Sequence, residues 1–126
     1  MDEKILIINP GSTSTKLAVF RDEEEIWKDT ITHSSKELEK FAKIIDQLKW
    51  RKELIREDLK EEGFELNDFS AIVARGGLID PIPGGTYKID RVMRKDLRTG
   101  KNGEHASNLA GIIAYDLAEE FNLKAY

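Results

Sequence analysis

The stretch INPGSTSTKLAV, residues 8–19, decides the fold of this chain. An apolar run ends at Asn9, and a second apolar run begins after Lys16. Between them lie a proline, Gly11 and four consecutive hydroxyl side chains: Ser12, Thr13, Ser14 and Thr15. Such residues are typical of ordinary solvent-facing turns. Backbone N–H groups and hydroxyls in a turn can also bind an anion, and a lysine adds a point charge for a phosphate. The spacing is not that of a Walker A loop. These residues alone therefore do not decide between an ordinary solvent-facing turn and a phosphate-binding turn.

The pattern around this turn predicts an α/β protein whose mixed sheet begins with an antiparallel meander. Short β-type runs occupy residues 4–9, 16–22 and 24–33, too close together for crossover helices between them. A buried strand is expected again at 69–75, and the last residues, LKAY at 123–126, resemble the opening of another strand. The sheet is therefore expected to be incomplete within this chain.

Helical periodicity separates these strands. Ser34 and Glu37 have the spacing of a capping box, and apolar residues then recur every three or four positions through Leu48. The pattern continues through Leu59, with a break expected near Trp50 and an end at Gly63. Further on we expect a Pro/Gly-rich loop at 76–85, a short strand or extended segment at 86–90, a helix at 91–100 ended by glycine, and a last helix with its apolar face at 109–121.

Composition narrows the class of protein. The chain has 126 residues, no cysteine and only two, widely separated histidines, so disulfides, thiolate chemistry and a metal site are not expected. A net charge of −4, with basic residues interleaved with acidic ones as in KWRKELIREDLKEE (49–62), argues against nucleic-acid binding and predicts a solvated helix face there. No apolar run is long enough to span a membrane, and we expect a cytoplasmic protein.

Two further loops contain candidate functional residues. In ARGGLIDPIPGG, Arg75 at a strand end precedes two glycines, where a guanidinium can meet a carboxylate or phosphate; a purely structural role is equally compatible. In NGEHASNLAG, His105 lies just before a helix, where a capping or surface role is the commoner one. The turn at 9–16 and Arg75 would converge in one cleft, which indicates nucleotide binding or phosphoryl transfer.

Three segments together resemble one family over essentially all 126 residues. INPGSTSTKLAVF, ARGGLIDPIPGGTY and GEHASNLAGIIAYDLA resemble the N-terminal part of butyrate kinases, which belong to the acetate kinase group of the actin-like ATPases. The resemblance implies a ribonuclease H-like domain. It also implies reversible phosphoryl transfer between ATP and butyrate with Mg²⁺, giving ADP and butyryl phosphate. Isobutyrate, acetate or propionate kinase, or a non-catalytic nucleotide-binding half-domain, are the alternatives.

The resemblance also implies roles for individual residues. Asn9, ranked first, with Gly11, Ser12, Thr13, Ser14 and Lys16, would contact nucleotide or transferring phosphates. Asn9 and Arg75 are the candidate catalytic residues. The carboxylate or acyl phosphate is expected to be bound by Ala74, Arg75, Gly76, Gly77 and His105.

Three positions depart from the acetate kinase pattern. Those enzymes have an arginine where this chain has Ile72, whereas Arg75 occupies the place of their histidine. Ala74 stands where they have a valine, which would leave room for two more methylenes and discriminate by roughly 1–3 kcal/mol.

Length is a further departure. Family members are roughly three times longer and have a second actin-like domain. We therefore expect residues 1–126 to be the N-terminal part of the first domain of a longer protein, inactive alone and homo-oligomeric at full length.

Overall fold

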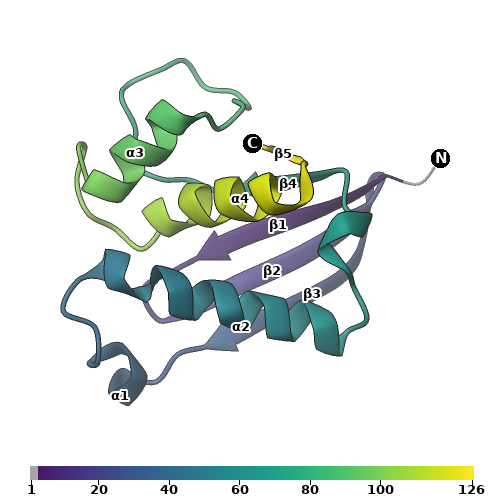
Figure 1. Cartoon of the computed structure of the whole chain (residues 1–126), viewed down its shortest axis with the longest axis horizontal. Helices are drawn as coiled ribbons and strands as arrows, with labels where there is room; N and C mark the ends of the chain where they lie inside the picture. Colours follow the sequence, from purple (N-terminus) through teal and green to yellow (C-terminus); the bar gives the residue numbers. More distant parts are fainter. Residues whose placement is uncertain (1–2) are drawn as a thin grey trace.

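The computed structural model describes residues 3–126 as a five-stranded sheet with helices packed on one face (Figure 1). The strands are β1 (Lys4–Pro10), β2 (Ser14–Arg21), β3 (Glu24–Thr32), β4 (Ala71–Ala74) and β5 (Lys124–Ala125). The helices are α1 (Ser35–Leu38), α2 (Leu48–Glu61), α3 (Arg91–Thr99) and α4 (Asn108–Phe121), with 3₁₀ turns at Ile44–Gln47 and Leu66–Asp68.

The sheet is mixed and has the order β3-β2-β1-β4-β5. The first three strands form the predicted antiparallel meander, in which Asn9 pairs with Lys16 and Pro10 with Thr15. β4 then pairs with β1 in parallel, and β5 with β4 in parallel. The α/β class and the mixed sheet that opens with a meander are therefore confirmed.

The core lies between the sheet and the two long helices. Alternate residues of β1 and β2 are buried because successive side chains of a strand point to opposite faces. Figure 1 shows α2 and α4 crossing the same face of the sheet. The fully or almost fully buried side chains there are Leu6, Ile8, Leu17, Val19, Ile55, Leu59, Ile72, Leu109, Ile113 and Leu117.

The opposite face of the central strands is only partly covered. Ile7, Ala18 and Phe20, which point away from the helices, are half-buried. Together with the strand ends they line a hollow of about 610 Å³. The turn between β1 and β2 lies at one end of this hollow.

The predicted helix from Ser34 to Leu48 is wrong in its middle. The capping box of Ser34 and Glu37 is present, but α1 lasts a single turn. The chain becomes extended again at Lys43, whose N–H donates to the Asp46 side chain at 3.1 Å and starts a new turn. The break therefore lies before α2 and not near Trp50, which is inside α2 and packs its ring on Phe41 at 5.1 Å.

The later elements follow the expectations more closely. Gly63, with a positive φ of 86°, lies directly after the last capping residue of α2, and Gly100 ends α3 in the left-handed conformation. The segment 86–90 is irregular, although Ile89 donates its N–H to the carbonyl of Ala125 at 2.8 Å. β4 is shorter than the predicted 69–75, and β5 forms as the last strand.

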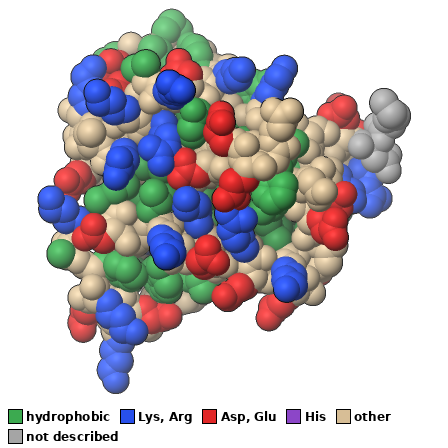
Figure 2. Space-filling model, viewed as in Figure 1, with side chains coloured by type: hydrophobic (Ala, Val, Ile, Leu, Met, Phe, Trp, Pro, Cys, Tyr) green, Lys and Arg blue, Asp and Glu red, His purple; other side chains and the backbone are tan. Residues whose placement is uncertain are grey.

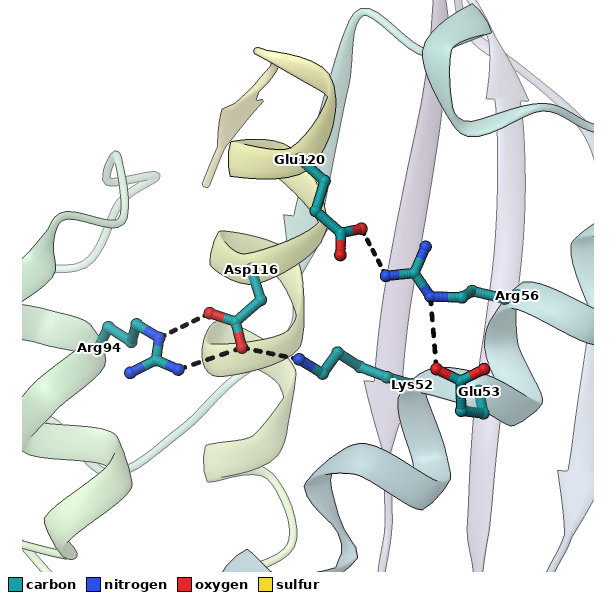
Figure 3. A network of polar contacts seen from close by, with 6 residues as sticks. All are labelled: Lys52, Glu53, Arg56, Arg94, Asp116 and Glu120. Atoms are coloured by element: carbon teal, nitrogen blue, oxygen red, sulfur yellow. Dashed lines mark hydrogen bonds and ion pairs between the residues drawn. The ribbon is translucent and has the colours of Figure 1, made fainter.

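Asp116 joins the three longest helices through its carboxylate (Figure 3). Arg94 of α3 binds both oxygens, with Nε at 2.6 Å and Nη2 at 3.1 Å, and Lys52 of α2 reaches Oδ2 at 3.0 Å. Burial opposes ionisation of Asp116, but the hydrogen bonds from Arg94 and Lys52 outweigh it and hold its pKa below the usual value. This network orients α3 and α2 around α4.

The helix-covered face of the molecule has an evenly mixed charge. Figure 2 shows Lys and Arg interspersed with Asp and Glu over this face, without a large area of one sign. Within residues 3–126, no helix has the length and apolar character needed to cross a membrane.

Asp58 generates the first prediction. Its Oδ2 is buried without a hydrogen-bond partner among the described residues. Burial first, and then the nearby carboxylates of Asp29, Glu61 and Glu62, raise the pKa of Asp58 to about 6. The unfolded chain has the ordinary pKa near 4, so the folded state binds more protons between these values. The free energy of unfolding should therefore fall as the pH rises from about 4 to 6.

Replacing Asp58 by Asn removes this charge and should raise the free energy of unfolding at pH 7 by roughly 1–2 kcal/mol, after allowance for partial solvation. It should also flatten the dependence of stability on pH between 4 and 6. Urea unfolding from pH 4 to 8 measures both effects, with the exposed Asp68→Asn as control. An Asp58→Asn protein with the wild-type pH slope would contradict the assignment.

Candidate functional site

The turn between β1 and β2 is the centre of the candidate site. It is closed by a hydrogen bond from the Gly11 N–H to the Ser14 carbonyl at 2.7 Å. Ser12 and Thr13 are exposed at its tip, and Lys16 is exposed on β2. Because Lys16 pairs with Asn9 across the two strands, their side chains project on the same face, away from the helices.

The carbonyl groups of this turn are occupied from inside the protein. The Thr13 carbonyl accepts the His33 N–H at 2.9 Å, and the carbonyls of Ser12 and Ser14 accept hydrogen bonds from Arg51. In contrast, the N–H groups of Ser12 and Thr13 have no acceptor within residues 3–126. Free N–H groups at a turn are what an anion needs.

Arg75 joins the turn at the same end of the sheet. Its N–H donates to the carbonyl of Ile8 at 3.1 Å, which places Arg75 beside Asn9 on the neighbouring strand. Asn9, Lys16 and Arg75 all line the hollow of about 610 Å³ on the open face. The expected convergence of the first turn and the arginine loop is therefore present in the fold.

The far end of this hollow has a different chemistry. Glu25 pairs with Phe20, four residues further along β2 than Lys16, which is about 13 Å along a strand. The walls between them include the apolar side chains of Ile7 and Ala18. Lys28 also lines the hollow but forms an ion pair with Glu25 at 4.0 Å, whereas Asn9, Lys16 and Arg75 lie at the end nearest the turn.

The remaining predicted substrate residues lie elsewhere. Ala74, Gly76 and Gly77 line a second hollow of about 240 Å³, together with Tyr87 and Tyr126. Ala74 and Arg75, adjacent in the sequence, therefore border different hollows. The structure does not bring the whole predicted substrate set into one space.

His105 is also separated from Asn9 and Lys16. Its ring is exposed, and its Nδ1 accepts the Ser107 N–H at 3.0 Å and lies 2.9 Å from the Ser107 hydroxyl. These contacts cap the residues that lead into α4. The geometry supports a capping role for His105, while its predicted contact with substrate stays a prediction.

Asn108 explains why two of the sequence motifs lie together. This buried residue donates from Nδ2 to the Gly103 carbonyl at 2.8 Å and accepts the Leu78 N–H at Oδ1 at 2.7 Å. It therefore fastens the glycine-rich loop after Arg75 to the start of α4. Gly77, beside this contact, has a φ of 122°, which favours glycine. An added Cβ there would also lie 3.0 Å from a methyl group of Leu97.

Arg51, Gln47 and His33 were not identified from the sequence as site residues. The expected solvated face at 49–62 is wrong for Arg51, which has no exposed surface. The usable signal was its spacing of four from Ile55 and eight from Leu59, which places all three on the buried stripe of α2.

No three acidic or histidine side chains are grouped to hold a metal ion within residues 3–126.

The fold and this site define a class of protein. A mixed sheet in this order, with a hydroxyl-rich turn after β1 and Arg75 directly after β4, is consistent with the N-terminal part of an actin-like α/β domain. No protein-family model matches the chain.

Comparison with known proteins identifies the relatives. The chain is 54% identical over all 126 residues to Butyrate kinase 2 of Clostridium acetobutylicum and 50% identical over 123 residues to Butyrate kinase 1 of that organism. It is 45% identical over 126 residues to a probable butyrate kinase of Clostridium botulinum. The chain is thus similar to butyrate kinases along its whole length, which confirms the resemblance, and it spans 35–36% of the length of these relatives.

The Asn108 clamp yields the second prediction. Replacing Asn108 by Ala leaves the Leu78 N–H and the Gly103 carbonyl without partners, and should lower the free energy of unfolding by about 1–3 kcal/mol. Amide exchange of the loop 76–80 should accelerate, as measured by hydrogen–deuterium exchange. The matched control is Asn102→Ala, which removes only an exposed hydrogen bond to Asp80. Equal effects of the two variants on this loop would contradict the clamp.

Proposed function

We propose that this chain forms part of a butyrate kinase and supplies the phosphate-binding half of a site that transfers a phosphoryl group between ATP and butyrate. The observation that carries the proposal is the convergence of Asn9, Lys16 and Arg75 on one hollow beside a turn with free N–H groups. The similarity to butyrate kinases over the whole chain supports the same reaction.

Phosphoryl transfer depends mainly on positioning and on neutralising charge. In the proposed site the N–H groups of Ser12 and Thr13 bind phosphate oxygens, and the Lys16 ammonium supplies a point charge. The Asn9 amide donates a directed hydrogen bond from the same face. Arg75 has a planar guanidinium that suits a carboxylate or the transferring group.

Mg²⁺ enters this proposal only with the nucleotide. The residues described here do not form a metal cage, and Mg²⁺ in nucleotide sites is held largely by substrate phosphates and water. When bound, it would offset phosphate charge. We also propose that the whole protein is a cytoplasmic homo-oligomer with a second lobe that completes the site.

The third prediction tests the turn. In the protein made from the complete reading frame, Asn9→Ala and Lys16→Ala should each lower kcat for ATP formation from ADP and butyryl phosphate by 100-fold or more. The physical reason is the loss of a donor or charge aimed at the transferring phosphate. Lys49→Ala, which removes an exposed lysine of α2, is the matched control and should retain wild-type activity.

The same assay separates the alternative functions. Faster turnover with isobutyrate, acetate or propionate than with butyrate would transfer the assignment to that kinase. Nucleotide binding without turnover on any of these carboxylates would favour a non-catalytic nucleotide-binding domain.

The fourth prediction concerns the length of the acyl chain. If the acyl group extends into the hollow beside Ala74, an added branched side chain there takes up its space. Ala74→Val should then lower kcat/KM for butyrate about tenfold relative to acetate. The control is Ala71→Val, the same change at the other end of β4. An equal loss with both carboxylates would remove Ala74 from the specificity pocket.

A further inference from the structure

Arg51 is a fully buried cation beneath the candidate phosphate-binding turn. Its side chain has no exposed surface. Nε donates to Gln47 Oε1 at 3.0 Å, and Nη1 donates to the Ser14 carbonyl at 3.0 Å and to Thr15 Oγ1 at 3.2 Å. Nη2 makes a longer contact of 3.5 Å with the Ser12 carbonyl. One side chain of α2 therefore contacts three residues of the β1–β2 hairpin.

No carboxylate within the described residues forms an ion pair with Arg51. Burial lowers the pKa of Arg51 to about 10, so it remains charged at neutral pH. Burial and the Arg51 charge both lower the pKa of the neighbouring His33, so His33 favours its neutral form and adds no second positive charge. Burying a cation without a counter-charge is costly. A fold that needed only packing at this position could place an apolar side chain there.

The hydrogen bonds of Arg51 also determine which way the peptide group between Ser12 and Thr13 points. In a trans peptide unit, the C=O of one residue and the N–H of the next point in opposite directions. With the Ser12 carbonyl drawn inward toward Arg51, the Thr13 N–H points outward. The Thr13 N–H is one of the two that have no acceptor within residues 3–126.

We propose that Arg51 is a positioning residue for phosphate binding: it holds the Thr13 N–H outward and places an uncompensated positive charge behind the turn. The missing counter-charge is then supplied by a phosphate group of the nucleotide in front of the turn. This inference rests on the proposed function. Arg51 touches neither substrate nor reacting atoms, and acts through the backbone of Ser12 and Ser14.

The test compares variants of the protein made from the complete reading frame. Arg51→Met should raise KM for ADP and ATP at least tenfold while KM for butyrate stays within about twofold. Arg51→Lys retains the charge but cannot span both carbonyls, and should raise KM for nucleotide about threefold to tenfold. The matched control is Arg56→Met on the same helix, which loses an ion pair with Glu120 but lies away from the turn.

A second measurement does not depend on a variant that folds. Inorganic pyrophosphate is titrated into ¹⁵N-labelled wild-type protein, and the Thr13 amide and the Arg51 Nε–H resonances should shift more than those of surface residues such as Lys49. A purely structural Arg51 would leave the Arg51 resonance unmoved and would change both KM values together. Either of these results overturns the inference.

The outcomes distinguish this inference from the proposed function. If Asn9→Ala and Lys16→Ala abolish turnover but Arg51→Lys folds with a wild-type KM for nucleotide, the function stands and the role of Arg51 is wrong. If Asn9→Ala and Lys16→Ala leave turnover unchanged, the proposed site itself fails.

Discussion

The contact between the Arg51 guanidinium and the hairpin backbone connects the three parts of this fold. It joins α2 to the turn of the meander, and through Thr15 it reaches His33 at the end of β3, whose Nε2 lies 2.8 Å from the Thr15 hydroxyl. His33 in turn packs its ring against Trp50, one residue before Arg51. The polar groups are buried, so each must keep its partner. The turn is consequently fixed by tertiary contacts with residues far along the chain: His33 lies 18 residues after Thr15, and Arg51 lies 36 residues after it.

A second constraint is the unequal treatment of the two faces of the sheet. Leu6, Ile8 and Leu17 are closed off by α2 and α4, whereas Ile7 and Phe20 remain half-buried on the other side. In β1 this alternation passes directly into the candidate site, because Asn9 follows the parity of Ile7. The same period-two geometry that builds the core therefore delivers the polar side chains to the open face. Arg75 reaches that face because β4 runs parallel to β1 and ends beside it.

Features encoded by residues close together in the sequence could be predicted, whereas features that depend on tertiary contacts could not. The meander was predictable from short β-type runs and a turn, and the proximity of Asn9 and Arg75 from their places at the ends of strands. The helix break before α2 was not, because the capping of Lys43 by Asp46 interrupts an otherwise regular apolar pattern. The burial of Arg51 could not be predicted from the charged run around it, because such a run usually lies in water. Only the spacing of Arg51 from Ile55 indicated a buried position. The separation of His105 from the turn depends on tertiary packing, which the residues around His105 in the sequence do not predict.

Two arginines of this fold differ in whether their charge is paired with a carboxylate. Arg94 is paired with Asp116, and the hydrogen bond to that carboxylate raises its pKa (Figure 3). Its charge is satisfied within the protein, and the pair fastens α3 to α4. Arg51 is more deeply buried and has only neutral oxygens for partners, so burial lowers its pKa. A cation that is already paired with a carboxylate attracts an anionic ligand only weakly. A cation bound only by neutral dipoles retains its field, and that field reaches the turn at Ser12 and Thr13, because Arg51 contacts the carbonyls of Ser12 and Ser14. The energetic cost of burying Arg51 without a counter-charge is therefore understandable if an anion binds there.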